Sequence, residues 1–176
     1  MNRRFEYDHL VFDGMIAKVH KVGLRMGDGK VVQRDYIHYP GAAVVLPLLG
    51  DGRIAVIRNY RFAVEEKLYE LPAGGLGQGE DPAACAAREL TEETGLAAGK
   101  LRKLGGFYTG PGVSDEYIHA YLATELAQGP QALEPYEDIA VELLSQRQIR
   151  TMVASGEIRD AKTLATLSLY WMQEEV

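Results

Sequence analysis

PAGGLGQGEDPAACAARELTEETGL, residues 72–96, places a glycine-rich loop directly before a stretch with helical spacing. Asp81 is a favourable N-cap and Pro82 suits the first helical position, so the sequence predicts a helix over about 82–94. Gly95 is then expected at the end of this helix in the left-handed conformation. The loop is unusual because acidic residues follow its glycines, where a phosphate-binding loop carries a lysine.

Three glutamates lie on one face of the predicted helix, because Glu89, Glu92 and Glu93 are spaced i, i+3 and i+4. Carboxylates this close repel one another, so the cluster is either a solvated face with ion pairs or a site for a hard cation. Arg88 precedes Glu92 by four residues and can pair with it. The cluster lies away from the positive end of the helix dipole, and the glycines let backbone approach a ligand closely. Both features favour Mg²⁺ that bridges carboxylates to phosphates.

Other common sites are not supported by the sequence. The glycines lack the lysine of a P-loop and the spacing of the dinucleotide-binding fingerprint. The four histidines show no zinc spacing, and no Gly-x-Ser-x-Gly elbow occurs. The single cysteine, Cys85, lies on the alanine-rich side of the predicted helix, so we expect it to fill space rather than act as a nucleophile.

The composition indicates one domain with a proper core: 176 residues, 47% hydrophobic and 25% charged. A net charge of −6 argues against a general binder of nucleic acids or anionic membranes. A phosphorylated ligand would therefore be small and accompanied by cations. One cysteine indicates a reducing compartment, and no signal peptide or membrane span is visible, so we expect a soluble cytoplasmic protein.

The rest of the chain predicts a mixed α/β fold. Residues before the glycine loop have the pattern of paired strands, with turn signals at 27–30 and 50–53. Two more strands and a short last strand at 139–145 are expected after the helix, followed by two C-terminal helices. The first 40 or so residues are predicted to form a partly separate β layer.

The segment quoted above resembles the Nudix box of the Nudix hydrolase family. The matching positions are Gly74, Glu80, Arg88, Glu89, Leu90, Glu92, Glu93, Gly95 and Leu96. The resemblance implies a Nudix fold, an α/β/α sandwich around a mixed β-sheet with an N-terminal antiparallel β layer. It also implies metal-dependent cleavage of a nucleoside diphosphate linked to another moiety. Residues 1–40 are then a dimerisation element and 41–176 the hydrolase domain.

The resemblance also implies roles for individual residues of the box. Glu89 and Glu93 are similar to the principal metal ligands of the family, and Glu92 is similar to a further or water-mediated ligand. Arg88 resembles the residue that orients the carboxylates during catalysis. The carbonyl of Ala73 is similar to one that ligates metal in the ADP-ribose pyrophosphatase branch. The implied cofactor is Mg²⁺, with Mn²⁺ as a substitute and two or three ions in the site.

Features outside the box resemble the same branch. YELPAG at 69–74 is similar to the motif that leads into its box, and 156–171 is similar to its closing helix. Pro111 follows Gly95 by sixteen residues, where that branch has a signature proline. The implied substrate-binding residues are Arg34, Arg61, Glu70, Pro111, Gly112 and Ser114.

Two glutamates are candidates for the residue that deprotonates the attacking water. Glu137 lies in EPYEDIAVELLS, residues 134–145, which resembles the late acidic loop of the branch, and it is also a candidate metal ligand. Glu116 is the alternative base, in a segment that lies near the distal sugar in the family. Arg34 resembles a residue that stacks on the base from across a dimer, so the expected protein is a homodimer.

The implied reaction is Mg²⁺-dependent hydrolysis of ADP-ribose to AMP and ribose 5-phosphate. GDP-mannose or another nucleotide sugar is an alternative, because base and sugar pockets are built from loops. A nucleoside triphosphate pyrophosphatase is disfavoured by the extra β layer and Pro111. A non-hydrolysing ligand sensor is disfavoured because all the glutamates of the box are present. The expected partner is the small-molecule substrate, with no nucleic acid and no membrane.

Overall fold

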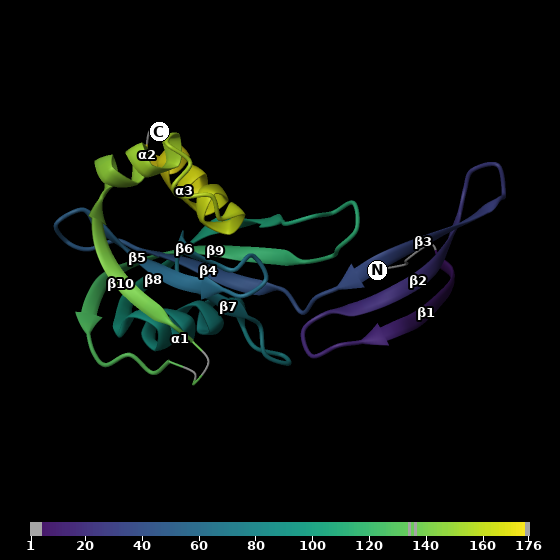
Figure 1. Ribbon diagram of the computed structural model, residues 1–176, viewed down its shortest axis with the longest axis horizontal. Helices are drawn as coiled ribbons and strands as arrows, with labels where there is room; N and C mark the ends of the chain where they lie inside the picture. Colours follow the sequence, from purple (N-terminus) through teal and green to yellow (C-terminus); the bar gives the residue numbers. More distant parts are fainter. Residues whose placement is uncertain (1–4, 134, 136, 175–176) are drawn as a thin grey trace.

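The computed structural model describes residues 5–133, 135 and 137–174, which form ten strands and three helices (Figure 1). The strands are β1 (Phe5–Asp13), β2 (Lys18–Arg25), β3 (Val31–His38), β4 (Ala42–Pro47), β5 (Arg53–Arg61), β6 (Glu66–Glu70), β7 (Ala73–Gly75), β8 (Leu96–Tyr108), β9 (Tyr117–Gln128) and β10 (Ile139–Ser145). The helices are α1 (Pro82–Thr94), α2 (Gln146–Ala154) and α3 (Ala161–Glu174). Within the described chain, no helix combines the length and apolar character needed to cross a membrane.

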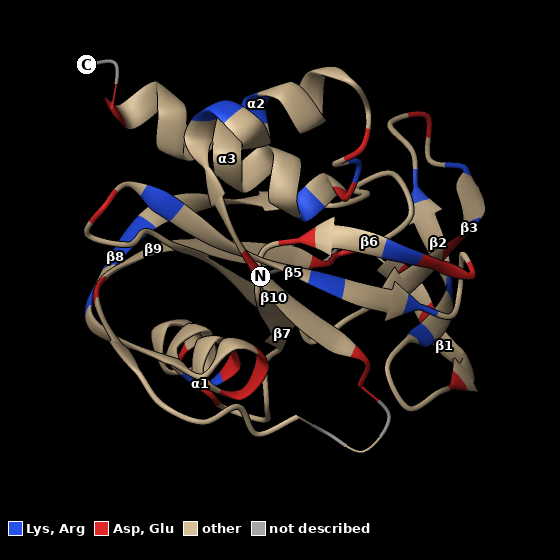
Figure 2. Cartoon of the chain, turned by 60° about the vertical axis from the view of Figure 1, so that its left-hand side comes forward, with Lys and Arg blue, Asp and Glu red and all other residues tan. Residues whose placement is uncertain are grey.

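Two sheets form the centre of an α/β/α sandwich. One has the order β10-β5-β6 and is antiparallel, and the other has the order β7-β4-β9-β8 and is mixed because β4 and β9 run parallel. Helix α1 covers one side, and α2 and α3 cover the other (Figure 2). Successive residues of β4 alternate between these layers: Val44 packs with the α2/α3 side and Val45 packs with α1. The predicted α/β/α fold is confirmed.

The N-terminal sheet, ordered β1-β2-β3, projects from the sandwich as an antiparallel arm (Figure 1). The predicted β layer is thus confirmed, with β1 as a strand that the sequence pattern did not single out; residues 1–4 of that layer lie outside the described residues. The arm is held by the loop between β8 and β9. Ile37 N–H donates to the Val113 carbonyl at 2.8 Å, and His38 Nδ1 lies 2.7 Å from Asp115 Oδ2.

Helix α1 begins and ends where its sequence predicts. Asp81 Oδ1 accepts hydrogen bonds from the N–H groups of Ala83 at 2.9 Å and Ala84 at 3.2 Å, which are otherwise without partners in the first turn. Gly95 has φ 72° and donates its N–H to the Thr91 carbonyl at 2.8 Å. These local interactions fix the limits of α1, and so place Glu89, Glu92 and Glu93 on one face of the helix.

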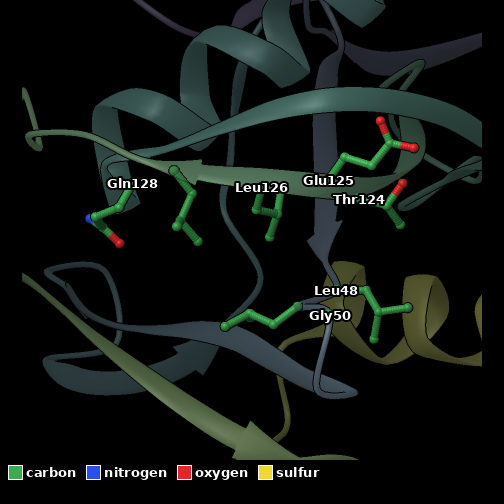
Figure 3. Close-up of a pocket in the computed structure, with 8 residues that line it drawn as sticks. Leu48, Gly50, Thr124, Glu125, Leu126 and Gln128 are labelled. Atoms are coloured by element: carbon green, nitrogen blue, oxygen red, sulfur yellow. The ribbon is translucent and has the colours of Figure 1, made fainter.

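A hollow of about 660 Å³ lies between the β4–β5 turn and the ends of β8 and β9 (Figure 3). Leucines from the turn and from the strands, including Leu48 and Leu126, line this hollow. Glu125 is the single carboxylate in its lining. None of the sequence-predicted site residues contributes to its wall. An apolar hollow with one negative charge does not suit a diphosphate, so this hollow is not a candidate substrate site.

Candidate active site

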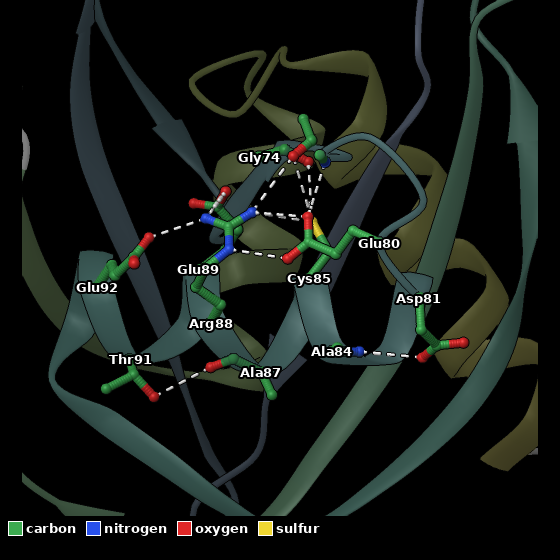
Figure 4. Close-up of polar contacts among 12 residues, drawn as sticks. Gly74, Glu80, Asp81, Ala84, Cys85, Ala87, Arg88, Glu89, Thr91 and Glu92 are labelled. Atoms are coloured by element: carbon green, nitrogen blue, oxygen red, sulfur yellow. Dashed lines mark hydrogen bonds and ion pairs between the residues drawn. The ribbon is translucent and has the colours of Figure 1, made fainter.

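The carboxylates of Glu89 and Glu92 on α1 and of Glu80 in the glycine loop gather around the guanidinium of Arg88 (Figure 4). Its Nη1 donates to Glu89 Oε1 at 2.6 Å and to Glu92 Oε2 at 2.9 Å, and its Nε donates to Glu80 Oε1 at 3.0 Å. Glu80 also accepts a bond from the Gly77 N–H at 2.8 Å. The hydrogen bond from Arg88 lowers the pKa of Glu80 to about 2. Glu80 therefore stays charged and ties the glycine loop to the helix.

Glu93 is only 3% exposed, and its Oε2 accepts a hydrogen bond from the Ala73 N–H at 2.9 Å. Burial raises the pKa of Glu93 to about 8, and the negative charges of Glu89 and Glu137 act in the same direction. Burial also raises the pKa of Glu89, in spite of the neighbouring Arg88. The protein thus holds two partly desolvated carboxylates side by side, an arrangement that a cation would stabilise.

Strand β7 lies directly against this pair. A Cβ atom on Gly74 would lie 1.9 Å from Glu89 Oε1, so only glycine fits there with the carboxylate in its present position. The neighbouring residue is Ala73, whose N–H already holds Glu93. The backbone predicted to supply a carbonyl ligand therefore stands beside the two predicted carboxylate ligands.

The loop between β9 and β10 is docked on the C-terminal end of α1. Gly129, Gln131 and Ala132 donate hydrogen bonds of 2.6 to 2.9 Å to carbonyl oxygens in and just after its last turn. Glu137 follows in this loop, near enough for its charge to raise the pKa of both Glu89 and Glu93. Residues 134 and 136 of the predicted acidic loop lie outside the described residues.

A pocket of about 370 Å³ opens beside β7 and contains both basic and acidic side chains. Arg61 lines it and donates to both oxygens of Glu70, with Nε–Oε1 at 2.7 Å and Nη2–Oε2 at 2.6 Å. The hydrogen bonds to Glu70 raise the pKa of Arg61, so its charge is secure. Glu70 itself is buried behind Arg61 and does not line the pocket. The structure thus places Glu70, which was predicted to bind substrate, against Arg61 and not on the pocket wall.

Sequence reasoning missed Lys162 and Asp160, which line the same pocket. Asp160 Oδ2 accepts the Thr163 N–H at 2.9 Å at the start of α3, as an N-cap does. Lys162 therefore stands in the first helical turn, where the helix dipole disfavours a cation. A lysine at this unfavourable position is the feature of the sequence that could have identified Lys162 as a site residue.

The loop between β8 and β9 contributes Glu116 to the pocket wall. Its Oε2 accepts a hydrogen bond from Thr109 Oγ1 at 2.6 Å, and its N–H donates to Ser114 Oγ at 3.0 Å. Pro111 and Gly112 form an exposed turn of this loop and do not line the pocket. The structure thus brings Glu116 to the site and leaves the two turn residues at its margin.

Arg34 lies on the exposed surface of β3, where its Nη1 donates to the Gln33 carbonyl at 2.8 Å. It does not line the pocket of its own chain. One copy of the chain therefore does not bring Arg34 to the other predicted substrate-binding residues.

Among the described residues, no three His, Cys, Asp or Glu side chains are already arranged around one point as metal ligands are. The chemistry of the donors still fits a divalent cation. Glu89, Glu93 and Glu137 offer hard oxygen atoms and influence one another through their charges, and Glu92 lies at the exposed edge of the group.

Residues 38–167 match the sequence model of the NUDIX domain. An ADP-ribose pyrophosphatase of Bacillus subtilis (strain 168) is 36% identical over 166 residues, which cover 93% of this chain and 90% of that protein. A GDP-mannose pyrophosphatase of Escherichia coli O1:K1 / APEC is 33% identical over 158 residues, 82% of each chain. The crystal structure of an ADP compounds hydrolase superposes with a TM-score of 0.80 at 20% identity, over 97% of this chain and 94% of that one, which shows a shared fold.

Proposed function

The chain belongs to the NUDIX family of hydrolases acting on pyrophosphate bonds, and we propose that its substrate is a nucleoside diphosphate sugar. ADP-ribose, cleaved to AMP and ribose 5-phosphate, is the leading candidate. The observation that carries this proposal is the pair of carboxylates, the buried Glu93 and the partly buried Glu89, beside a pocket that Arg61 lines. The 36% identity to an ADP-ribose pyrophosphatase over nearly the whole chain supports the choice of substrate.

Members of this family generally use divalent metals, and the proposed ions here are two or three Mg²⁺, with Mn²⁺ as a substitute. Glu89 and Glu93 would be the principal ligands, with Glu92, Glu137 and the Ala73 carbonyl as further ones. When bound, the ions neutralise the diphosphate and lower the pKa of water. Their binding would also relieve the repulsion between the buried carboxylates.

The side chains of the site have separate roles in this proposal. Arg61 binds the diphosphate, because it carries a secure charge and faces the pocket. Arg88 holds Glu89 and Glu92 in orientation through its bonds to both. Glu137 takes the proton of the attacking water, since it lies beside the carboxylate pair; Glu116 is the alternative, because it lines the pocket.

The loop after β8 would meet the sugar end of the substrate. Ser114 Oγ accepts a hydrogen bond from the N–H of Glu116 and so stabilises the loop at the pocket wall. Pro111 and Gly112 would border the distal sugar from the exposed turn beside it. Base and sugar preferences would then depend on this loop, and GDP-mannose is the second candidate substrate, supported by the 33% identity to a GDP-mannose pyrophosphatase.

The N-terminal layer, residues 1–40, is proposed to form a homodimer with a second copy, and 41–176 is proposed to be the hydrolase domain. A small sheet depends on a hydrophobic face or on packing against another element for its stability. The arm also exposes a run of apolar side chains, namely Leu10, Val11, Phe12, Met15 and Ile16. Dimerisation would bring Arg34 to the base of the substrate in the partner's site.

Product analysis tests the hydrolase proposal. The protein is incubated with Mg²⁺ or Mn²⁺ and a panel of ADP-ribose, GDP-mannose, other nucleotide sugars and nucleoside triphosphates, and products are separated by anion exchange. Formation of a nucleoside monophosphate and a sugar phosphate is expected. Cleavage of triphosphates alone, or of nothing, would refute it.

Sedimentation tests the dimer: Phe12→Glu, which charges a side chain that is 60% exposed, should yield monomers. The cytoplasmic location predicted from the single cysteine remains a prediction.

A further inference from the structure

Two acidic and two basic side chains form a network at one wall of the pocket. At its centre is Glu70, whose side chain has no exposed surface. Arg61 donates to both of its oxygens, and Lys162 Nζ donates to Oε2, the same oxygen that Arg61 Nη2 contacts. Lys162 also donates to Asp160 Oδ1 at 2.9 Å. In Figure 2 the blue start of α3 lies close to the red end of β6, where these groups meet.

The two cations of the network differ in their access to a ligand. The Arg61 side chain is 40% exposed, whereas that of Lys162 is 17% exposed and is held between two carboxylates. A lysine in this position is disfavoured by the helix dipole and by desolvation, and its ion pairs to Glu70 and Asp160 compensate for both. Lys162 is therefore better placed to hold Glu70 than to contact a substrate.

We propose that Lys162 is a positioning residue that keeps the guanidinium of Arg61 directed into the pocket by sharing the Glu70 carboxylate with it. The four side chains have a formal net charge of zero. Without Lys162 the two acids Glu70 and Asp160 would remain, with Arg61 as the one cation of the network. Asp160 already acts on Arg61 through its charge, after the larger effect of Glu70. Both acids would then draw the guanidinium away from the phosphates. This inference rests on the proposed function, in which Arg61 binds the diphosphate.

Steady-state kinetics of Lys162→Met test this role. We expect KM for the nucleotide sugar that the wild type cleaves to rise about tenfold, with kcat within about threefold, because one guanidinium–phosphate contact is weakened. Lys162→Arg should keep KM within about threefold of the wild type. Lys100→Met, at an exposed position of β8, is the matched control and should leave both constants unchanged. A fall in kcat with KM unchanged would overturn the proposal.

A double-mutant cycle separates positioning from a direct effect of the lysine charge. In a Glu70→Gln background the carboxylate that Arg61 and Lys162 share is absent, so adding Lys162→Met should change KM by less than about threefold. A tenfold rise in both backgrounds would mean that Lys162 acts on the substrate by itself, and the proposal would be overturned. If circular dichroism shows that Lys162→Met is unfolded, Lys162→Gln replaces it in the cycle, since glutamine keeps polar contacts while removing the charge.

Binding of ADP keeps this test independent of the proposed reaction. Calorimetry in Ca²⁺ measures the affinity for this nucleoside diphosphate, which contains the phosphates but no sugar leaving group. Lys162→Met should bind ADP about tenfold more weakly than the wild type, whatever the wild type hydrolyses. Equal affinity would overturn the positioning role, whereas failure of the wild type to cleave any member of the substrate panel would overturn only the proposed function.

Discussion

Replacing Glu93 by glutamine should stabilise the metal-free protein while removing its activity. The pKa of Glu93 is raised from 4.5 to about 8, chiefly by burial. The stability associated with its neutral form is therefore fully present below pH 4.5 and is lost as the pH rises through about 8. At 1.36 kcal/mol per unit, the wild type loses about 4 to 5 kcal/mol by pH 8.5. Glutamine cannot ionise and avoids this loss.

Part of the gain is offset in the variant. The Ala73 N–H donates to a carboxylate in the wild type and would donate to a weaker amide oxygen in Glu93→Gln. A hydrogen bond to a charged group contributes about 1.5 to 3 kcal/mol, compared with about 1 kcal/mol for a neutral one. We therefore expect a net stabilisation of about 2 to 4.5 kcal/mol at pH 8.5, or about 4 to 18 °C in the melting temperature.

The assay is thermal unfolding with a chelator at pH 8.5 and pH 5, together with turnover in Mg²⁺. At pH 5 the difference in unfolding free energy should fall below about 1 kcal/mol, because both side chains are then neutral in the folded state. Turnover should fall at least ~100-fold, the scale of one lost catalytic electrostatic contact. Glu157→Gln, at an exposed position after α2, is the control and should change neither property.

Two outcomes would contradict the roles predicted for Glu93. A variant no more stable than the wild type at pH 8.5 would show that burial of the Glu93 carboxylate is not unfavourable. Normal turnover of the variant would remove Glu93 from the proposed metal ligands. Addition of Mg²⁺ gives a further check, because it should raise the melting temperature of the wild type more than that of Glu93→Gln.

Three further predictions follow from the geometry of α1 and β7. Gly74→Ala should lower turnover at least ~10-fold in a folded protein, because its Cβ would displace Glu89, whereas Gly50→Ala meets no atom within 4 Å and should have no effect on turnover. Asp81→Ala should reduce the free energy of unfolding in urea by about 1 kcal/mol through loss of the N-cap bonds; an unchanged midpoint and slope would contradict that role. Cys85, which is buried with its pKa raised to about 11 by desolvation, should react with Ellman's reagent only after unfolding, and fast reaction of the native protein would argue against its packing role.

The sequence alone predicted the features that depend on residues close together in the chain. The limits of α1 follow from a cap at Asp81 and a left-handed glycine at Gly95, each acting within one helical turn. The fold class follows from β-strand patterns before the glycine loop and helical spacing at the C-terminus. The pairing of Arg88 with Glu92 was also predictable, since residues four apart meet on a helix.

Only the tertiary structure decided which distant residues share the site. Lys162 reaches Glu70 across 92 positions of sequence, and the hydrogen bond between His38 and Asp115 spans 77. The desolvation that raises the pKa of Glu93 likewise comes from the elements packed around α1. Such contacts depend on how the sheets pack and how loops dock on helix ends, and no short pattern encodes that packing. Spacing along the chain therefore determined which carboxylates stand together, whereas packing between layers determined their burial, their charge and the cations that face them.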